Sequence, residues 1–162
     1  MNSNPWDALE RAIELAVSAH RGQRDKAGLP YILHLLQVMQ NVSDPIDKQA
    51  AVLHDYIEDV GGTVEEMKRH GITDSAIEAI QLLSKSDDCS YCEYVVRLSS
   101  NPIATRVKLA DLQDNYRIGR VAYRMGNESE DAMRMQRYAL THQYLSNAID
   151  ENSYRMRMVG LE

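Results

Sequence analysis

The spacing of apolar residues constrains this chain more than any other feature of its sequence. Apolar residues recur at the three- and four-residue intervals of an amphipathic helix almost throughout, and alternating runs of β-branched residues are nearly absent. Helix-start signals agree, because Asn4 and Asp44 each precede a proline, and Thr63 and Glu66 have the spacing of a capping box. The sequence therefore predicts an all-α fold. About eight helices are expected, over residues 5–20, 31–42, 45–60, 63–70, 74–85, 90–99, 102–124 and 129–157.

Length and charge narrow the class of protein. A chain of 162 residues suits a single domain spanning residues 1–162. Its 18 basic and 24 acidic residues give a net charge of -6, so neither nucleic acid nor an anionic membrane is an expected partner. No apolar run approaches the ~18 residues of a membrane helix, and the first ten residues lack the pattern of a signal peptide. We therefore expect a cytoplasmic protein.

The segment 50–60, AAVLHDYIEDV, carries one histidine and three carboxylates within an otherwise apolar stretch. If the segment is one continuous helix, these four side chains share a face opposite its apolar residues. Such a face can simply be the solvated side of an amphipathic helix. A histidine beside an aspartate can instead supply a nitrogen and an oxygen to a divalent metal, if further ligands come from elsewhere. The four residues are His54, Asp55, Glu58 and Asp59.

His34 and Asp111 are the candidates for those further ligands. His34 ends the apolar segment PYILH after a glycine-rich loop, and Asp111 lies at the polar end of VKLAD. Either residue alone is more typical of an ordinary core or surface position. Only their combination with the segment 50–60 indicates a metal site.

Three blocks of sequence together resemble a known family. AHRGQRDKAGLPYILH, AVLHDYIED and KLADLQDN occur in this order, within a region from about Ala8 to Leu145 that covers most of the chain. They resemble the HD-domain hydrolases of the RelA/SpoT type, which include small alarmone hydrolases and the metazoan SpoT homologue. These enzymes remove the 3′-pyrophosphate from guanosine tetra- and pentaphosphate. The resemblance implies an HD-domain helical bundle and a phosphohydrolase that needs no covalent enzyme intermediate.

The resemblance also implies roles for particular residues. A mixed set of nitrogen and oxygen ligands fits Mn²⁺ better than a closed zinc site, with another divalent metal as the alternative. The implied metal ligands are His34, His54, Asp55 and Asp111. Glu58 and Asp59 would orient or deprotonate the attacking water, and Asn115 would lie near the reacting phosphate. The implied substrate contacts are Arg24, Lys26, Lys85, Arg117, Arg134 and Tyr138.

Several positions depart from the family pattern, and they affect the choice of nucleobase. Asp25 stands where the family has a basic residue beside Lys26, and Ile118 stands where it has threonine. The family's Arg-Leu-His before the asparagine is Leu112-Gln113-Asp114 here. We therefore expect weak or lost selectivity for guanine. The alternatives are an HD phosphohydrolase acting on another nucleotide, such as an adenosine alarmone or a nucleoside phosphate, and a nucleotide-binding regulator without turnover.

Overall fold

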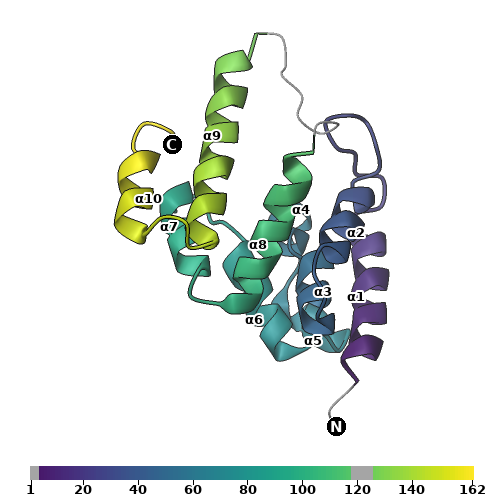
Figure 1. Ribbon diagram of the computed structural model, residues 1–162. Helices are drawn as coiled ribbons and strands as arrows, with labels where there is room; N and C mark the ends of the chain where they lie inside the picture. The colour runs from purple at the N-terminus through teal and green to yellow at the C-terminus, as the bar shows by residue number, and fades with distance from the viewer. Residues whose placement is uncertain (1–3, 118–125) are drawn as a thin grey trace.

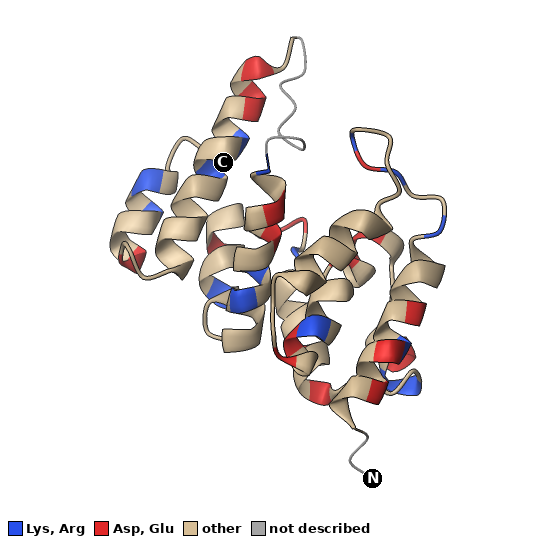
Figure 2. Ribbon diagram, turned by 45° about the vertical axis from the view of Figure 1, so that its right-hand side comes forward, with Lys and Arg blue, Asp and Glu red and all other residues tan. Residues whose placement is uncertain are grey.

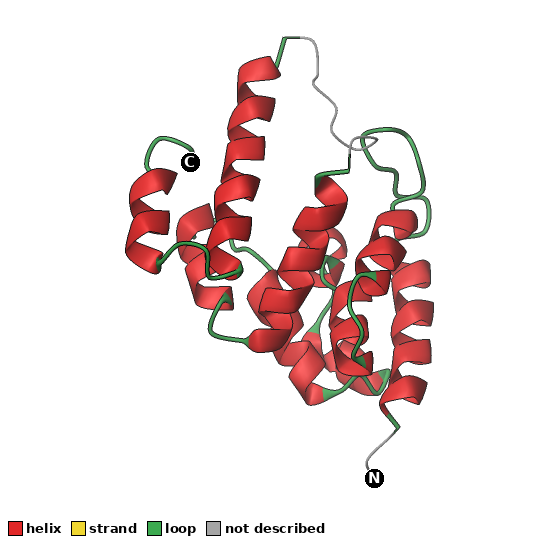
Figure 3. Ribbon diagram, viewed as in Figure 1, coloured by secondary structure: helices red, strands yellow, loops and turns green. Residues whose placement is uncertain are grey.

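The computed structural model describes residues 4–117 and 126–162, and within these ranges it contains helices and no β-strand (Figures 1 and 3). The predicted all-α fold is confirmed. None of the described helices is long and apolar enough to cross a membrane. The helices are α1 (Pro5–Ala19), α2 (Ile32–Gln40), α3 (Pro45–Val52), α4 (Tyr56–Val60), α5 (Val64–Arg69), α6 (Asp74–Leu83), α7 (Tyr91–Leu98), α8 (Pro102–Asn115), α9 (Glu128–Leu145) and α10 (Glu151–Met158).

Helix α3 lies at the centre of the fold and packs against α1, α2, α6 and α8. Its small residues Ala50 and Ala51 have no exposed surface, so neighbouring helices approach its backbone closely. Figure 1 shows α1, α2 and α3 side by side, α8 next to them, and α9 with α7 and α10 on the far side of α8. This packing brings α2, the end of α3 and α8 to one place in the interior.

An ion pair also joins α3 to α8. The Arg106 guanidinium donates through Nε and Nη2 to the two oxygens of Asp47, at 2.5 and 2.8 Å. The Asp47 side chain is only 3% exposed, whereas that of Arg106 is 52% exposed. Because a buried carboxylate needs donors, this bidentate pair fixes the relative position of the two helices.

The predicted continuous helix over 45–60 is wrong, because the chain leaves the helix at Leu53 and resumes it as α4 at Tyr56. Within this turn the ring nitrogen Nδ1 of His54 lies 2.8 Å from the carbonyl oxygen of Ala51. The His54 side chain thus forms a hydrogen bond with a backbone carbonyl oxygen at the end of α3. As a result, His54 and Asp55 belong to a turn between two helices and not to a helix face.

Helix α4 ends in two glycines that have different environments. Gly61 has a positive φ of 69°, the left-handed conformation that glycine adopts without a steric penalty. Gly62 instead lies against the buried ring of Tyr56, and a Cβ added there would be 2.1 Å from Tyr56 Cε1. The phenol donates to Glu66 Oε2 at 3.2 Å, which connects α4 to α5. Close packing therefore requires glycine at 62, whereas backbone conformation favours it at 61.

The C-terminal region also differs from the expectation of one helix over 129–157. The chain forms α9 and α10, separated by a turn in which Asn147 has a φ of 61°. Asp150 then caps α10 by accepting from the Ser153 backbone N–H at 2.7 Å. The turn folds α10 back on α9, where the rings of Tyr144 and Tyr154 stack with centroids 4.7 Å apart. Helix α8, expected over 102–124, ends at Asn115, and residues 118–125 lie outside the described part of the chain.

Candidate active site

Four ionisable side chains from three parts of the chain meet in the interior. His34 comes from α2, His54 and Asp55 from the turn after α3, and Asp111 from α8. His34 Nε2 lies 3.3 Å from Asp111 Oδ1, and His54 Nε2 lies 3.7 Å from the same oxygen and 3.1 Å from Asp55 Oδ2. Potential ligand atoms of His34, His54 and Asp111 all lie within 4.8 Å of one another, and these three residues are buried. The structure thus brings together the four predicted metal ligands.

Hydrogen bonds orient both imidazole rings in the same sense. His54 presents Nδ1 to the carbonyl oxygen of Ala51, and His34 presents Nδ1 to Asp114 Oδ2 at 2.7 Å. Carbonyl and carboxylate oxygens only accept, so Nδ1 is the donor in each ring. Both Nε2 atoms therefore face the Asp111 carboxylate.

The two carboxylates of the cluster are held by neighbouring donors. The Tyr31 hydroxyl donates to Asp55 Oδ2 at 2.6 Å. Lys108 Nζ donates to Asp111 Oδ2 at 2.8 Å, and Asn115 Nδ2 donates to Asp111 Oδ1 at 2.7 Å. Asn115, which we expected near a reacting phosphate, thus also contacts a candidate metal ligand.

Burial and neighbouring charges perturb the pKa values of the cluster. Burial alone would lower the pKa of His54, but the Asp55 and Asp111 carboxylates outweigh this effect and raise the pKa to about 9. For Asp55, burial favours the neutral acid, yet His54 and the Tyr31 hydroxyl lower its pKa to about 2. Burial likewise opposes ionisation of Asp111, but Lys108 and the two histidines hold its pKa well below the usual range. The cluster therefore consists of anionic carboxylates around a protonated His54. A metal cation can replace that proton.

The chemistry of these donors fits a divalent ion. Two imidazole rings with fixed orientations and two anionic carboxylates form a mixed nitrogen and oxygen set. Each histidine has a hydrogen-bonded Nδ1, as metal-binding histidines usually do. The residues present are therefore suited to a divalent metal.

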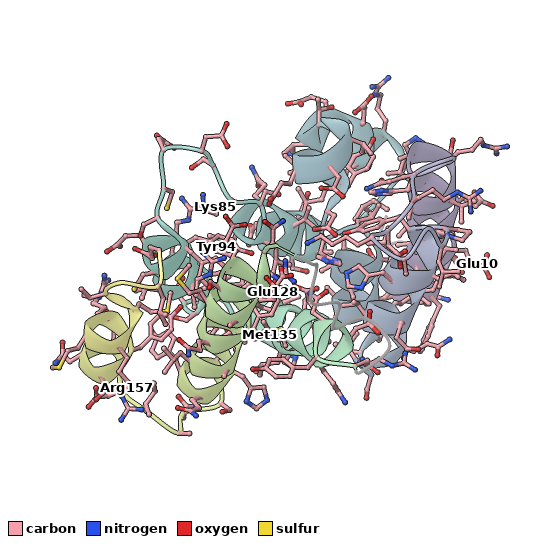
Figure 4. All side chains as sticks on the ribbon, turned by 90° about the horizontal axis from the view of Figure 1, so that it is seen from above. Glu10, Lys85, Tyr94, Glu128, Met135 and Arg157 are labelled. Carbon is pink, nitrogen blue, oxygen red and sulfur yellow. The ribbon has the colours of Figure 1, made fainter. Side chains whose placement is uncertain are left out.

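A cavity of about 570 Å³ opens next to the cluster. It is bounded by the loop between α1 and α2, by α4, by the end of α8 and by α9, whose Met135 is labelled in Figure 4. Basic side chains of the loop and of α9 line this cavity together with the carboxylates, which suits an anionic ligand such as a phosphate. The predicted site residues that line it are Arg24, Lys26, His34, Asp55, Glu58, Asp59, Asp111, Asn115, Arg134 and Tyr138.

The backbone and a nearby glutamine orient Glu58 and Asp59 at this cavity. Glu58 Oε2 accepts from the backbone N–H of Lys85 at 3.1 Å. Asp59 Oδ2 accepts from Gln23 Nε2 at 2.8 Å, and Gln23 Oε1 in turn lies 2.6 Å from His20 Nδ1. One oxygen of each carboxylate is therefore fixed, and the side chains point into the cavity despite the break in the predicted helix.

Three of the residues named from the sequence have other positions. Lys85 reaches the site through its backbone N–H, and its Nζ donates to the Ser86 carbonyl oxygen at 3.2 Å. Arg117 is not among the residues lining the cavity, and its Nη1 lies 3.3 Å from Asp114 Oδ1. Ile118, a position at which we expected altered base recognition, lies outside the described residues.

Asp25, the other unusual position in the base pocket, shapes the loop that carries Lys26. Asp25 Oδ1 accepts from the backbone N–H groups of Ala27 and Leu29, both at 2.9 Å. The loop is closed further by a bridge between Arg24 and Pro30. The carboxylate that replaces a basic residue therefore holds a turn at the mouth of the cavity.

Sequence reasoning missed several residues that hold the site together. Tyr31, Lys108 and Asp114 each contact a candidate metal ligand. Helical spacing was an available signal for Lys108 alone, which lies three positions from its partner Asp111, because Tyr31 contacts Asp55 and Asp114 contacts His34. A second cavity, of about 1040 Å³, lies between the α2–α3 loop, α8 and α9 and contains none of the cluster residues.

Comparisons with known proteins agree with this geometry. The chain is 31% identical over 155 residues to a GTP pyrophosphokinase of Streptomyces coelicolor, covering 87% of this chain but only 18% of that protein. It is 30% identical over 137 residues to the guanosine-3′,5′-bis(diphosphate) 3′-pyrophosphohydrolase MESH1 of Danio rerio, covering 72% of each chain. A solved structure, described as a metazoan orthologue of SpoT that hydrolyses ppGpp, shares the fold with a TM-score of 0.69 at 19% identity, over 99% of both chains. No family model matches the chain.

Proposed function

Because the chain belongs to the family of guanosine-3′,5′-bis(diphosphate) 3′-pyrophosphohydrolases that includes MESH1, we propose that it is a metal-dependent phosphohydrolase that removes pyrophosphate from an alarmone nucleotide. One observation carries the proposal. The buried cluster of His34, His54 and Asp111 lies beside a cavity that basic side chains of the α1–α2 loop and α9 also line. This combination suits a reaction in which water attacks a phosphorus atom.

We propose Mn²⁺ as the metal, held by His34, His54, Asp55 and Asp111. The mixed nitrogen and oxygen donors suit Mn²⁺ better than a closed zinc site. When bound, such an ion supplies a more acidic water and offsets negative charge on a phosphoryl group. Lys108, by donating to Asp111 Oδ2, holds that carboxylate so that Oδ1 faces the two imidazole rings.

Glu58 and Asp59 are the proposed acceptors of the proton from the attacking water. Each has one oxygen fixed by a donor, so the other oxygen can accept a hydrogen bond from water in the cavity. Arg24, Lys26 and Arg134 are placed to pair with phosphate oxygens. Proton transfer and phosphate binding are thus assigned to different walls of one cavity.

The substrate is proposed to be a free nucleotide in the cytoplasm and not nucleic acid or a membrane lipid. Figure 2 shows acidic and basic residues interspersed along the helices, and the whole chain has a net charge of -6. Such a surface does not attract a polyanion over a wide area. The basic groups that matter are those at the cavity.

Asp25 supports a second candidate, a phosphohydrolase of the same kind with altered base preference. Its carboxylate is engaged with backbone N–H groups of its own loop, at a place where the family has a cation. A purine there loses a stacking or cation–π contact, while the metal and phosphate contacts do not depend on the base. Adenosine alarmones are therefore candidate substrates beside guanosine alarmones.

The test is hydrolysis by metal-stripped protein, with and without Mn²⁺, of guanosine alarmones, adenosine alarmones and ordinary nucleotides. Release of pyrophosphate is expected only from substrates with a 3′-pyrophosphate and only with metal. Glu58→Gln should keep Mn²⁺ and lose most turnover, because the amide keeps the shape and removes the base. Glu65→Gln, at an exposed glutamate of α5 outside the cavity, is the matched control and should turn over normally.

Three results would contradict parts of the proposal. Equal hydrolysis with and without metal would exclude a metal-dependent reaction. Wild-type turnover by Glu58→Gln would remove that residue from the mechanism. Strong guanosine preference in the wild-type protein would show that residues other than Asp25 read the base.

A further inference from the structure

Asp114 forms a buried hydrogen bond with one of the candidate metal ligands. Its Oδ2 lies 2.7 Å from His34 Nδ1, and Asp114 as a whole is 1% exposed. The two residues are far apart in sequence, on α8 and α2, so the bond depends on the packing of these helices. Asp114 does not line the cavity and therefore does not face the substrate.

The two histidines of the cluster have different partners at Nδ1. His54 donates to the neutral carbonyl of Ala51, whereas His34 donates to a carboxylate. On its other oxygen the Asp114 carboxylate has the Arg117 guanidinium at 3.3 Å, and that side chain is 59% exposed. At Nδ1, therefore, His34 is hydrogen-bonded to an anion and His54 is not.

The Asp114 carboxylate is buried between α8 and α2, directly before Asn115 in the sequence. A buried carboxylate is costly unless it has strong donors. Its presence beside His34 therefore indicates a specific contribution at this position.

We propose that Asp114 is a positioning residue that fixes His34 with Nε2 toward the metal site and strengthens metal binding there. This inference rests on the proposed function, because it presumes that the His34 cluster holds a divalent ion. A carboxylate partner keeps the proton on Nδ1, prevents rotation of the ring and makes Nε2 a stronger electron-pair donor to a metal ion. Loss of such a partner typically weakens metal affinity about 10–100-fold.

The first experiment measures Mn²⁺ affinity directly, by electron paramagnetic resonance of free Mn²⁺ titrated with metal-stripped full-length protein. Asp114→Asn keeps the shape and a neutral acceptor but removes the charge. We expect its Kd for Mn²⁺ to rise about 10-fold or more. Asp47→Asn is the matched control, since it removes another buried carboxylate, on α3, that pairs with Arg106 of α8 and is not part of the metal cluster, and its Kd should be unchanged.

The second experiment reads the tautomer of His34 in metal-free wild-type protein, by long-range ¹H–¹⁵N NMR correlations of the imidazole. A proton on Nδ1 is expected, because this atom donates to Asp114. This measurement needs no variant, so the inference remains testable even if Asp114→Asn folds poorly. A ring without a proton on Nδ1 would overturn the inference.

The outcomes separate this inference from the proposed function. If the wild-type protein bound no Mn²⁺, the metal site would be refuted and the role of Asp114 with it. If the wild-type protein and Asp114→Asn bound Mn²⁺ equally well, only the positioning role would be wrong. An equal loss of affinity in Asp47→Asn would assign the effect to general destabilisation and would also overturn the role of Asp114.

Discussion

Replacing Gly62 by alanine should destabilise the protein through a single steric contact. The added Cβ would lie 2.1, 2.3 and 2.5 Å from Cε1, Cδ1 and Cζ of Tyr56, whereas carbon atoms in contact prefer about 3.5–4.0 Å. The ring must therefore move by about 1.5 Å out of a site where Tyr56 is only 5% exposed. Overpacking of a core costs about 1–3 kcal/mol, and complete loss of a buried aromatic side chain costs about 3–5 kcal/mol. We expect Gly62→Ala to cost about 2–4 kcal/mol in the free energy of unfolding.

Urea unfolding followed by circular dichroism measures this cost, and a double-mutant cycle with Tyr56→Ala tests its cause. Without the ring, Gly62→Ala should cost almost nothing, because Gly62 does not have a positive φ. Gly61→Ala is the control. Its Cβ has no neighbour within 4 Å, but its φ of 69° costs about 1–2 kcal/mol in either background. An equal cost of Gly62→Ala with and without the Tyr56 ring would refute the steric explanation.

Three further changes test the site and the fold. Asp55→Ala should abolish Mn²⁺ binding in the resonance titration, because it removes a proposed anionic ligand, and unchanged affinity would exclude Asp55 from the proposed metal site. Arg106→Met should lower the free energy of unfolding in urea by about 2–3 kcal/mol. This is less than the roughly 3–5 kcal/mol for breaking a fully buried pair, because water can reach Asp47 from the exposed side. A loss below about 0.5 kcal/mol would show that the pair does not hold α3 to α8. The pKa of Glu66 is lowered by hydrogen bonds from the Thr63 backbone N–H and hydroxyl. The stabilisation of the fold by ionised Glu66 is therefore fully present at pH values above the usual carboxyl pKa, and it is lost as the pH falls through the lowered pKa. Glu66→Gln should therefore flatten the loss of stability between pH 7 and pH 3.5 while keeping the cap, and an unchanged pH dependence would contradict this assignment.

The starts of helices were predictable because their chemistry is local. Asn4, Asp44 and Asn101 each precede a proline and each accept a hydrogen bond from the first turn of the helix that follows. The break at 53–55 has no glycine or proline and depends on the His54 ring reaching a backbone carbonyl. A pattern of apolar residues does not reveal such a bond.

The same distinction applies to the site. Three sequence blocks were sufficient to name residues that the fold brings to one cavity, since each block carries its own cluster of polar side chains. The partners that hold them, such as Tyr31 for Asp55 and Asp114 for His34, were missed because the contacts join different helices. The turn between α9 and α10 was missed although Asp150 and Ser153 have capping spacing, because the helical period continues across it.

The dispersal of the cluster over α2, the α3–α4 turn and α8 has a kinetic consequence. A folding chain must close two long loops before His34, His54 and Asp111 can meet, so a partly folded chain holds at most some of the ligands. Binding to the native state alone stabilises it by an amount that grows with the logarithm of ion concentration. Stabilising interactions that are absent from the folding transition state lower the unfolding rate and leave the folding rate almost unchanged. If the cluster holds Mn²⁺ as proposed, added Mn²⁺ should therefore prolong the lifetime of the folded protein while leaving the rate at which it folds almost unchanged.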